Sequence, residues 1–331
     1  MANILEMNAE TAPAAAFAME GFDTPFKTVE NFLPLAEAEA LRKAAETHFQ
    51  EPHKHTHDAH FIWNYWYVPG IYTYLRAQPE RVLGHALASL FHQKLQHWAK
   101  QTLGMGHVTW PMLSLYVDGC GQGIHNDATN GRFGYVFSLT RNDRNSRGGE
   151  TIVWKEGDPF RTRLNRADAG IGLYDLIPPV FNRLVLFDDR MPHGVQRIEG
   201  SMDPLDGRLV LHGHISESGA TIDGPLPPQD VNATVSPLIG AVFEKFGESA
   251  ALHHGPLVLR LEIGMDGTID SFSILVNRVA CSDGGDPEPL VGALLEAVLD
   301  ARFPPGGAPT IVTLPILCGG LLPFIQQQPQ P

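Results

Sequence analysis

The sequence between about residues 108 and 217 alternates short apolar runs with clusters of glycine, asparagine and aspartate. The runs are rich in β-branched and aromatic residues, which favour strands, and the breaks between them favour turns. They read VTWPMLSLYVD, FGYVFSLT, GETIVWKE, NRLVLFDD and GRLVLHGHI. Several short strands joined in this way predict an antiparallel jelly roll, or double-stranded β-helix, in which two stacked sheets protect their edges.

Helical patterns precede this region, and a second unit follows it. Apolar residues recur at helical spacing over residues 35–49 and 79–104. After residue 235, two helical patterns, a hairpin around Asp266-Gly267 and a final strand TIVTLPILC predict a smaller α+β domain. We therefore expect a mostly β fold divided into a flexible leader (1–22), a jelly-roll domain with N-terminal helices (23–220), a linker (221–234), an α+β domain (235–322) and a disordered tail (323–331).

Charge and cysteine content narrow the class of partner. The formal net charge of −13 opposes the neutralisation of phosphates that nucleic-acid binding requires. Cys120, Cys281 and Cys318 are too widely spaced for a disulfide framework. The N-terminus has no basic signal region, and no run approaches the roughly 20 apolar residues of a membrane span. We expect a cytoplasmic protein that binds neither nucleic acid nor membrane.

A histidine and an aspartate two residues apart, His125 and Asp127, are followed downstream by His193. Side chains two apart on a strand point to the same face, so both can reach one metal ion. A histidine from another strand would complete a set of two imidazoles and a carboxylate, which leaves positions on iron open for a co-substrate and dioxygen. A His-x-Asp pair alone also fits a surface turn, and the placement of His193 beyond an apolar strand favours the metal site.

Arg208 opens the next predicted strand, GRLVLHGHI. A buried arginine needs an anionic partner, because an unpaired buried charge is costly. The distal carboxylate of 2-oxoglutarate would supply that partner through a bidentate fork. An ion pair with Asp188 or Asp189 is the alternative.

The stretch from Tyr116 to Glu217 resembles the prolyl-hydroxylase-like branch of the Fe(II)/2-oxoglutarate oxygenases. Its pieces occur in that family's order: LYVDGCGQGIHND, FGYVFSLT, the Gly-Gly-Glu-Thr turn at residues 148–151, the strand ending at His193, and RLVLHGH. Upstream, FKTVENFLPLAEAEALRKA is similar to the family's first strand and helix. Together these pieces span residues 25–217.

This resemblance implies that His125, Asp127 and His193 hold Fe(II) and that Arg208 anchors 2-oxoglutarate. Tyr116 would add its hydroxyl to the same carboxylate, or would serve as a core aromatic. The implied activity is hydroxylation of an unactivated C–H bond of an amino-acid residue, proline first among them, in a peptide, a protein or a free amino acid. Dioxygen is the second co-substrate and ascorbate a candidate reductant. Halogenating relatives lack the carboxylate, so Asp127 favours hydroxylation.

Two other function classes stay open at this point. One is a tailoring oxygenase that acts on a small natural product, and the other is a non-catalytic module that holds metal without turnover.

Further pocket residues are expected from position. His214 stands where the family often has a tryptophan, and by alternation it shares an inward face with His212. Trp63 and Trp66 lie where the family keeps its substrate-facing lid, and Tyr135 is another candidate for the pocket. A histidine cluster in EPHKHTHDAH, residues 51–60, fits either a second metal site or a solvated, substrate-gating loop.

The C-terminal domain resembles the C-terminal domain of TonB-like proteins over about residues 235–320. The matching pieces are GMDGTIDSFSILVN, the helix before ARFPP and the strand TIVTLPILC. We interpret it as a binding module or as the interface of a homodimer.

Overall fold

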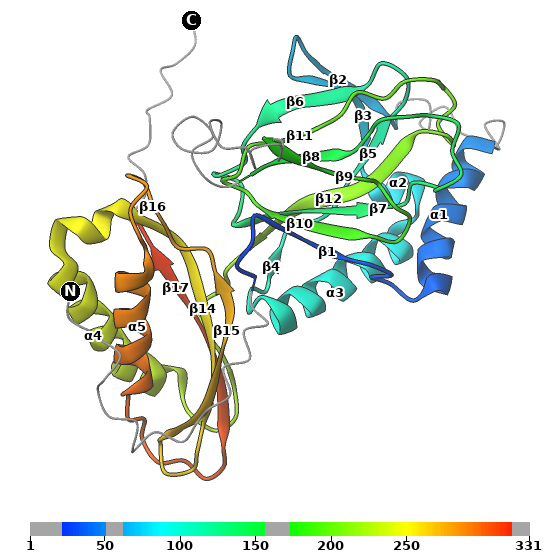
Figure 1. Cartoon of the computed structure of the whole chain (residues 1–331). Helices are drawn as coiled ribbons and strands as arrows, with labels where there is room; N and C mark the ends of the chain where they lie inside the picture. The colour runs from blue at the N-terminus through cyan, green and yellow to red at the C-terminus, as the bar shows by residue number, and fades with distance from the viewer. Residues whose placement is uncertain (1–21, 51–61, 156–172, 320–331) are drawn as a thin grey trace, which may run out of the picture. The chain divides into compact units, whose positions relative to one another are not determined.

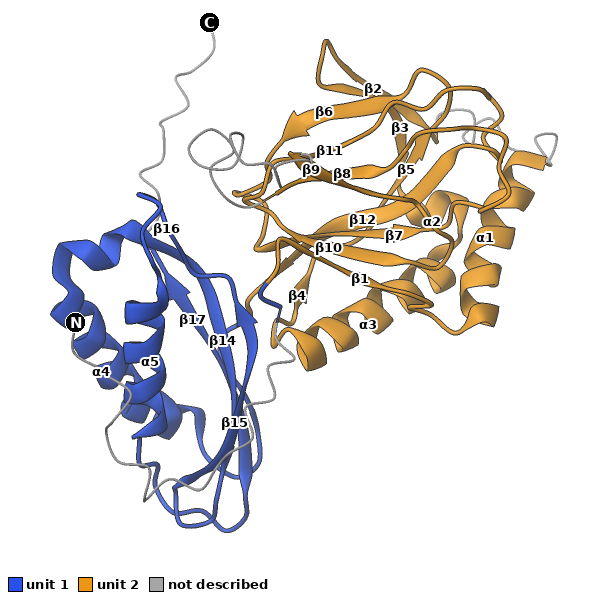
Figure 2. Ribbon diagram, viewed as in Figure 1, with its two compact units in different colours: residues 1–23, 219–331 blue, residues 24–218 orange. Residues whose placement is uncertain are grey.

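The computed structural model describes residues 22–50, 62–155 and 173–319. It divides into two compact units, which are coloured separately in Figure 2. The larger unit is formed by residues 24–218, and the smaller unit combines residues 1–23 with residues 219–331. The histidine cluster and the C-terminal tail lie outside the described residues.

In the described residues, the N-terminal half of the larger unit contains three α-helices: α1 (Leu35–Gln50), α2 (Pro79–Val82) and α3 (His85–Thr102). The buried residues of α3 recur at three- and four-residue spacing, from Ala88 through Phe91 and Leu95 to Ala99. Phe91 packs against Phe137 of the sheet, with ring centroids 5.0 Å apart. Along the chain that the structure describes, no helix combines the length and the apolar character needed to cross a membrane.

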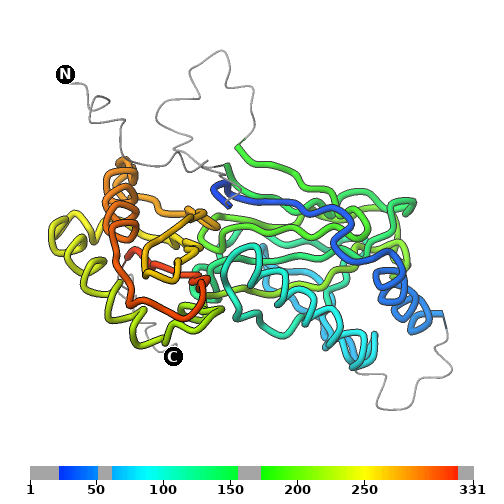
Figure 3. The backbone as a smooth tube through the Cα atoms, turned by 90° about the horizontal axis from the view of Figure 1, so that it is seen from below, coloured from blue at the N-terminus to red at the C-terminus, as the bar shows by residue number. Residues whose placement is uncertain are grey.

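The described part of the larger unit contains one twelve-stranded sheet, in the order β1-β10-β7-β12-β5-β3-β6-β11-β8-β9, with β2 on β3 and β4 on β12. Figures 1 and 3 show this sheet curling over itself, with helix α3 alongside it. The coarse expectation of a mostly β unit with a curled antiparallel sheet is confirmed. The strands are β1 (Phe26–Val29), β2 (Asn64–Val68), β3 (Tyr72–Ala77), β4 (His107–Val108), β5 (Met112–Tyr116), β6 (Gly121–His125), β7 (Phe133–Ser138), β8 (Thr151–Trp154), β9 (Tyr174–Ile177), β10 (Leu184–Asp188), β11 (His193–Val195) and β12 (Arg208–Ser216).

Alternation along the strands gives the sheet two different faces. On β7, Phe137 points toward the helices, whereas Gly134 and Val136 line a pocket on the other face. Gly134 is paired with His214 of β12, and Val136 is paired with His212. The pocket is therefore built on the face of the sheet that the helices do not cover.

The smaller unit is an α+β arrangement. Its sheet has the order β13-β17-β14-β15, with β16 on β14. Helix α5 buries Leu290, Leu294 and Val298 in the core that the sheet provides. Its elements are β13 (Thr221–Asp223), α4 (Pro228–Phe246), a 3-10 helix (Gly247–Leu252), β14 (His253–Ile263), β15 (Ile269–Asn277), β16 (Ala280–Cys281), α5 (Glu288–Leu299) and β17 (Thr310–Cys318).

Two segments have described structure at the expected boundaries. The expected linker, residues 221–234, contains strand β13, which pairs with β17, and the first turns of α4. Pro228 is the first residue of α4, a position where proline suits a helix, so the proline-rich sequence marked a helix start. The expected flexible leader ends in Phe22, which is 2% exposed and bonds to Leu275 and Asn277 of the smaller unit.

Candidate metal centre

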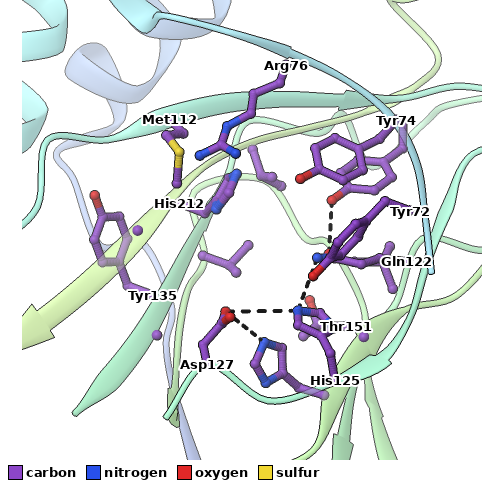
Figure 4. A pocket seen from close by; sticks show the side chains of 18 of the residues that line it. Tyr72, Tyr74, Arg76, Met112, Gln122, His125, Asp127, Tyr135, Thr151 and His212 are labelled. Atoms are coloured by element: carbon purple, nitrogen blue, oxygen red, sulfur yellow. Dashed lines mark hydrogen bonds and ion pairs between the residues drawn. The ribbon is translucent and has the colours of Figure 1, made fainter. Parts of the chain in front are cut away.

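One pocket of about 190 Å³ lies on the inner face of the curled sheet, and Figure 4 shows its lining side chains. Strand β12 contributes Arg208, Val210, His212 and His214, four residues in strict alternation. Its register with β5 places Arg208 beside Tyr116. Strands β3, β6, β8 and β11 also contribute to the lining, so side chains from distant parts of the curled sheet meet in this pocket.

His125, Asp127 and His193 meet at one side of this pocket. His125 ends β6 and is paired directly with His193 at the start of β11, with ring centroids 4.5 Å apart. The Oδ2 atom of Asp127 lies 3.4 Å from Nε2 of His193 and 3.9 Å from Nε2 of His125. The three donor atoms lie within 4.8 Å of one another. One ion could therefore contact all three.

Both imidazoles are oriented by their other ring nitrogen. The Nδ1 atom of His125 lies 2.8 Å from the carbonyl oxygen of Gly123, and Nδ1 of His193 lies 2.9 Å from that of Met191. A carbonyl only accepts, so each Nδ1 carries the proton and each Nε2 has a free lone pair. The amide of Gln122 donates to Nε2 of His125 across 3.2 Å, which is consistent with that tautomer.

The charge states around this set also suit a cation. Burial lowers the pKa of His125, so its ring is neutral at neutral pH. Burial alone would raise the pKa of the Asp127 carboxyl, but its interactions with His193, His125 and His214 outweigh burial, and the pKa lies below its usual value. A neutral imidazole and an ionised carboxylate are the forms that bind metal.

Arg208 is buried in the same pocket, with 2% of its surface exposed. Its Nη2 donates to the hydroxyl of Thr151 across 3.1 Å, and its guanidinium lies 4.9 Å from the centroid of the Tyr116 ring. Its Nε–H is buried without a hydrogen-bond partner. Among the described residues, no carboxylate lies within ion-pair distance of Arg208.

The two aspartates considered as alternative partners of Arg208 are engaged elsewhere. Asp188 accepts from Nε of Arg190 across 2.9 Å, and Oδ2 of Asp189 lies 3.0 Å from Nδ1 of His214. The alternative of an ion pair between Arg208 and either aspartate is therefore wrong.

Comparisons with known proteins add structural likeness at low identity. No family model and no curated protein matches the chain. A prolyl hydroxylase in complex with a hypoxia inducible factor oxygen degradation domain peptide fragment, from Trichoplax adhaerens, has 17% identity and a TM-score of 0.40 over 57% of this chain and 82% of that chain. A Pseudomonas putida prolyl-4-hydroxylase has 19% identity and a TM-score of 0.39 over 59% and 94%. The non-heme alpha ketoglutarate dependent epimerase SnoN from nogalamycin biosynthesis has 12% identity and a TM-score of 0.41 over 59% and 77%.

Tyr116 is buried and lines the pocket. Its ring stacks on that of Tyr74 at 5.0 Å, and its hydroxyl donates to Oε1 of Gln122 across 3.3 Å. Burial raises the pKa of this phenol, so it remains a hydrogen-bond donor at neutral pH. Tyr116 is thus both a packed aromatic and a polar group that lines the pocket.

The structure shows where the other residues expected in the pocket lie. His214, His212 and Trp66 line the pocket. Tyr135 also lines the pocket, while its ring packs near Phe91 and its hydroxyl donates to the carbonyl of Thr109.

The structure does not bring Trp63 into the pocket lining. Trp63 lies just before β2, where its indole N–H donates to His48 near the end of α1 across 3.1 Å. Its ring stacks on Phe49. The aromatic packing at the end of α1 draws this side chain away from the pocket.

Sequence reasoning missed several pocket residues, among them Arg76, Tyr72, Gln122 and Thr151. Thr151 is part of the Gly-Gly-Glu-Thr turn, so that signal was present. The run YTYLRA of β3 also contained a signal, because alternation places Tyr72, Tyr74 and Arg76 on one face. Asp189 was missed as the partner of His214, with which it and Asp127 form a second group of potential ligands.

Proposed function

We propose that residues 24–218 form a jelly-roll oxygenase that uses Fe(II) and 2-oxoglutarate to hydroxylate an unactivated C–H bond. One observation carries the proposal: two imidazoles and a carboxylate converge in the same pocket as a buried arginine without an anionic partner. The two imidazoles and the carboxylate suit a metal ion that keeps open coordination positions, and the arginine suits a dicarboxylate co-substrate.

The donor set fits iron. Two imidazole nitrogens and one carboxylate form the facial arrangement typical of non-haem Fe(II) oxygenases. The alternative group of Asp127, Asp189 and His214 fits less well, because Nδ1 of His214 is engaged by Asp189 across 3.0 Å. Iron held by His125, Asp127 and His193 would supply the activation of dioxygen, coupled to oxidative decarboxylation of 2-oxoglutarate, that C–H hydroxylation requires.

The chain's own residues supply position and charge. The carbonyls of Gly123 and Met191 fix the two imidazoles, so the donor set is organised before metal arrives. The free Nε–H of Arg208 offers a donor to the distal carboxylate of 2-oxoglutarate, while Thr151 holds the other side of the guanidinium. Tyr116 would present its hydroxyl to the same carboxylate. The aromatic walls exclude water from this ion pair.

The substrate proposed is an amino-acid residue, as in prolyl hydroxylases, in a peptide, a protein or a free amino acid. Asp127 supports hydroxylation, since it fills the coordination position that a halide would need. We propose a cytoplasmic enzyme, with ascorbate as a candidate reductant. We further propose that the smaller unit is a TonB-like binding or dimerisation module.

The test is a parallel measurement of binding and turnover on the full chain. Anaerobic titration should show one Fe(II) per chain, and 2-oxoglutarate should bind only to the iron-loaded protein. On admitting air, iron-loaded protein should form succinate from 2-oxoglutarate. Failure to bind iron would refute the proposal. Binding of both ligands without succinate, even with the amino acids and peptides used below, would instead support the non-catalytic metal-holding module.

A further inference from the structure

A second guanidinium, that of Arg76, faces the same pocket. Arg76 lies on β3, where its register partner on β5 is Ser114, and Ser114 is in turn paired with Val210 of β12. The three residues therefore share one row on the inner face. In Figure 4 the guanidinium of Arg76 lies next to His212 and Met112, on the side of the pocket away from Asp127 and His125.

No anionic partner for Arg76 is found among the described residues. Asp127 is the only carboxylate residue that the described part of the chain contributes to the pocket lining, and it belongs to the candidate metal set. Nearby His212 is half-buried and shares one hydrogen bond with the hydroxyl of Ser114 across 2.8 Å. Burial, followed by the charges of Arg76 and Arg208, lowers the pKa of His212 to about 3, so this ring is neutral at pH 7.

The position of Arg76 is nonetheless fixed. Its guanidinium carbon lies 4.7 Å from the centroid of the Trp66 ring, and Trp66 stacks on Tyr74. Stacking of this kind holds the planar group in place while its N–H edges remain available for a bidentate contact. A fixed, unpaired cation in a pocket is a recognition group for an anion.

One molecule of 2-oxoglutarate does not account for both arginines. Strand β5 lies between β3 and β12, so the backbones that carry Arg76 and Arg208 are about 10 Å apart. The two side chains also have different neighbours, since Arg208 contacts Thr151 and Tyr116 whereas Arg76 contacts Trp66.

Charge balance leads to the same conclusion. The positive charges of Fe(II) and Arg208 together equal the negative charges of Asp127 and dianionic 2-oxoglutarate. The charge of Arg76 would remain without a counterpart in the loaded pocket. Arg76 is half-buried, and a carboxylate on the second substrate would neutralise its charge as that substrate covers it.

We infer that Arg76 binds a carboxylate group of the substrate, which makes the substrate a free amino acid or a peptide whose C-terminal residue is oxidised. This inference rests on the proposed function, because it assigns a second substrate to the same site. A proline inside a peptide lacks such a carboxylate and would leave Arg76 unpaired.

The first test uses the unchanged protein, loaded with Fe(II) and 2-oxoglutarate. The probes are the twenty amino acids and their carboxamides, together with Gly-Pro and Gly-Pro-amide. Succinate formation above the substrate-free rate and a gain of one oxygen by the probe are measured. At least one free acid should stimulate turnover, with its carboxamide at least about 30-fold weaker in kcat/KM. Gly-Pro separates a peptide C-terminus from a free amino acid. Equal kcat/KM for a free acid and its carboxamide, or no stimulation of succinate formation by any free acid, would overturn the inference.

The second test uses Arg76→Gln and Arg76→Lys with the best acid from that panel. The Gln variant should raise KM for the acid at least about 30-fold, and the Lys variant should recover part of the loss because it keeps the charge without the fork. The matched control is Arg183→Gln, which removes an arginine that pairs with Glu30 outside the pocket lining.

Affinity for 2-oxoglutarate separates the two proposals. In Arg76→Gln it should stay within about twofold of the unchanged protein, because Arg208 holds the co-substrate. An unchanged KM for the acid would refute the role of Arg76 and would leave the proposed function standing. A loss of 2-oxoglutarate affinity would make Arg76 a co-substrate anchor and would also refute it. If the unchanged protein binds neither iron nor 2-oxoglutarate, the proposed function fails, and this inference fails with it.

Discussion

The Nη2 group of Arg208 donates to the hydroxyl of Thr151 across 3.1 Å, while the Nε–H of the same guanidinium has no partner. The contact fixes the orientation of the guanidinium and leaves one donor edge open. An arginine held in this way is prepared for an anion before the anion arrives, so less ordering is needed on binding.

Replacement of Arg208 by Gln should weaken 2-oxoglutarate binding by about 2–5 kcal/mol, the cost of removing one member of a desolvated charge pair. Thr151→Val should cost only about 0.5–1.5 kcal/mol, since it removes a hydrogen bond that orients the guanidinium but leaves its charge in place. Calorimetric titration of 2-oxoglutarate into the metal-loaded variants measures both, with Arg183→Gln as the control. Undiminished affinity in Arg208→Gln would place the anchor elsewhere.

Single replacements of His125, Asp127 and His193 by Ala should each abolish stoichiometric Fe(II) binding, because each removes one of the three protein donors on which the ion would depend. Circular dichroism should show an intact fold. His97→Ala, an exposed histidine on α3, is the matched control and should bind iron normally. A variant of the three that keeps full iron stoichiometry would remove its residue from the set.

Local patterns in the sequence predicted much of this pocket. Alternation along β12 brought Arg208, His212 and His214 to one face, and the structure places all three in the pocket lining. Their binding roles stay predictions. The spacing of His125 and Asp127 suggested a shared target, and the structure brings both to His193.

What the sequence could not supply was pairing between distant segments. Arg76 enters the pocket only because β3 pairs with β5, and no local signal specifies that neighbour. The pairing of Asp189 with His214 likewise depends on the fold of β10 beside β7 and β12. Trp63 was misplaced because its partners, His48 and Phe49, come from α1.

Gly134→Ala should destabilise the larger unit by about 1–3 kcal/mol, as expected for overpacking. A Cβ atom here would come within 2.4 Å of the Phe187 ring and 2.8 Å of Oδ1 of Asp189. Gly240→Ala is the control, since it lies in α4 with open space around it and should be neutral or stabilising. Urea unfolding measures both. Equal stability of Gly134→Ala and the unchanged protein would contradict the close packing.

Stability should depend on pH through Glu217. Burial raises the pKa of this carboxyl, but two hydrogen bonds from Arg132, each 2.9 Å, outweigh burial and hold the pKa below its ordinary value of 4.5. A lowered folded-state pKa means that the stabilisation is complete above pH 4.5 and is lost as pH falls through the folded-state pKa.

Glu217→Gln should therefore lower the free energy of unfolding by about 1 kcal/mol at neutral pH, and the difference should disappear in acid. Urea titrations across this pH range provide the measurement. Glu262→Gln, which changes an exposed carboxylate on β14, serves as the control. A difference that persists unchanged in acid would show that the ion pair is not its source.

Residues 24–218 expressed alone should fold and bind Fe(II) and 2-oxoglutarate, because every residue proposed for the site lies within that range. The C-terminal limit excludes β13, which belongs to the smaller unit by its pairing with β17. Parallel titrations of the shortened and full-length proteins, with light scattering for mass, test this. A folded, soluble 24–218 protein that cannot bind 2-oxoglutarate would show that the smaller unit completes the site.

The pairing of Phe22 with Val276 of β15 has a consequence for the order of synthesis. Phe22 leaves the ribosome before the entire larger unit, whereas its strand partner is made after it. The larger unit can therefore fold as soon as residue 218 has emerged, as domains commonly do during translation. The smaller unit can complete its folding only later, when newly made β15 can pair with Phe22, which was synthesised before the larger unit.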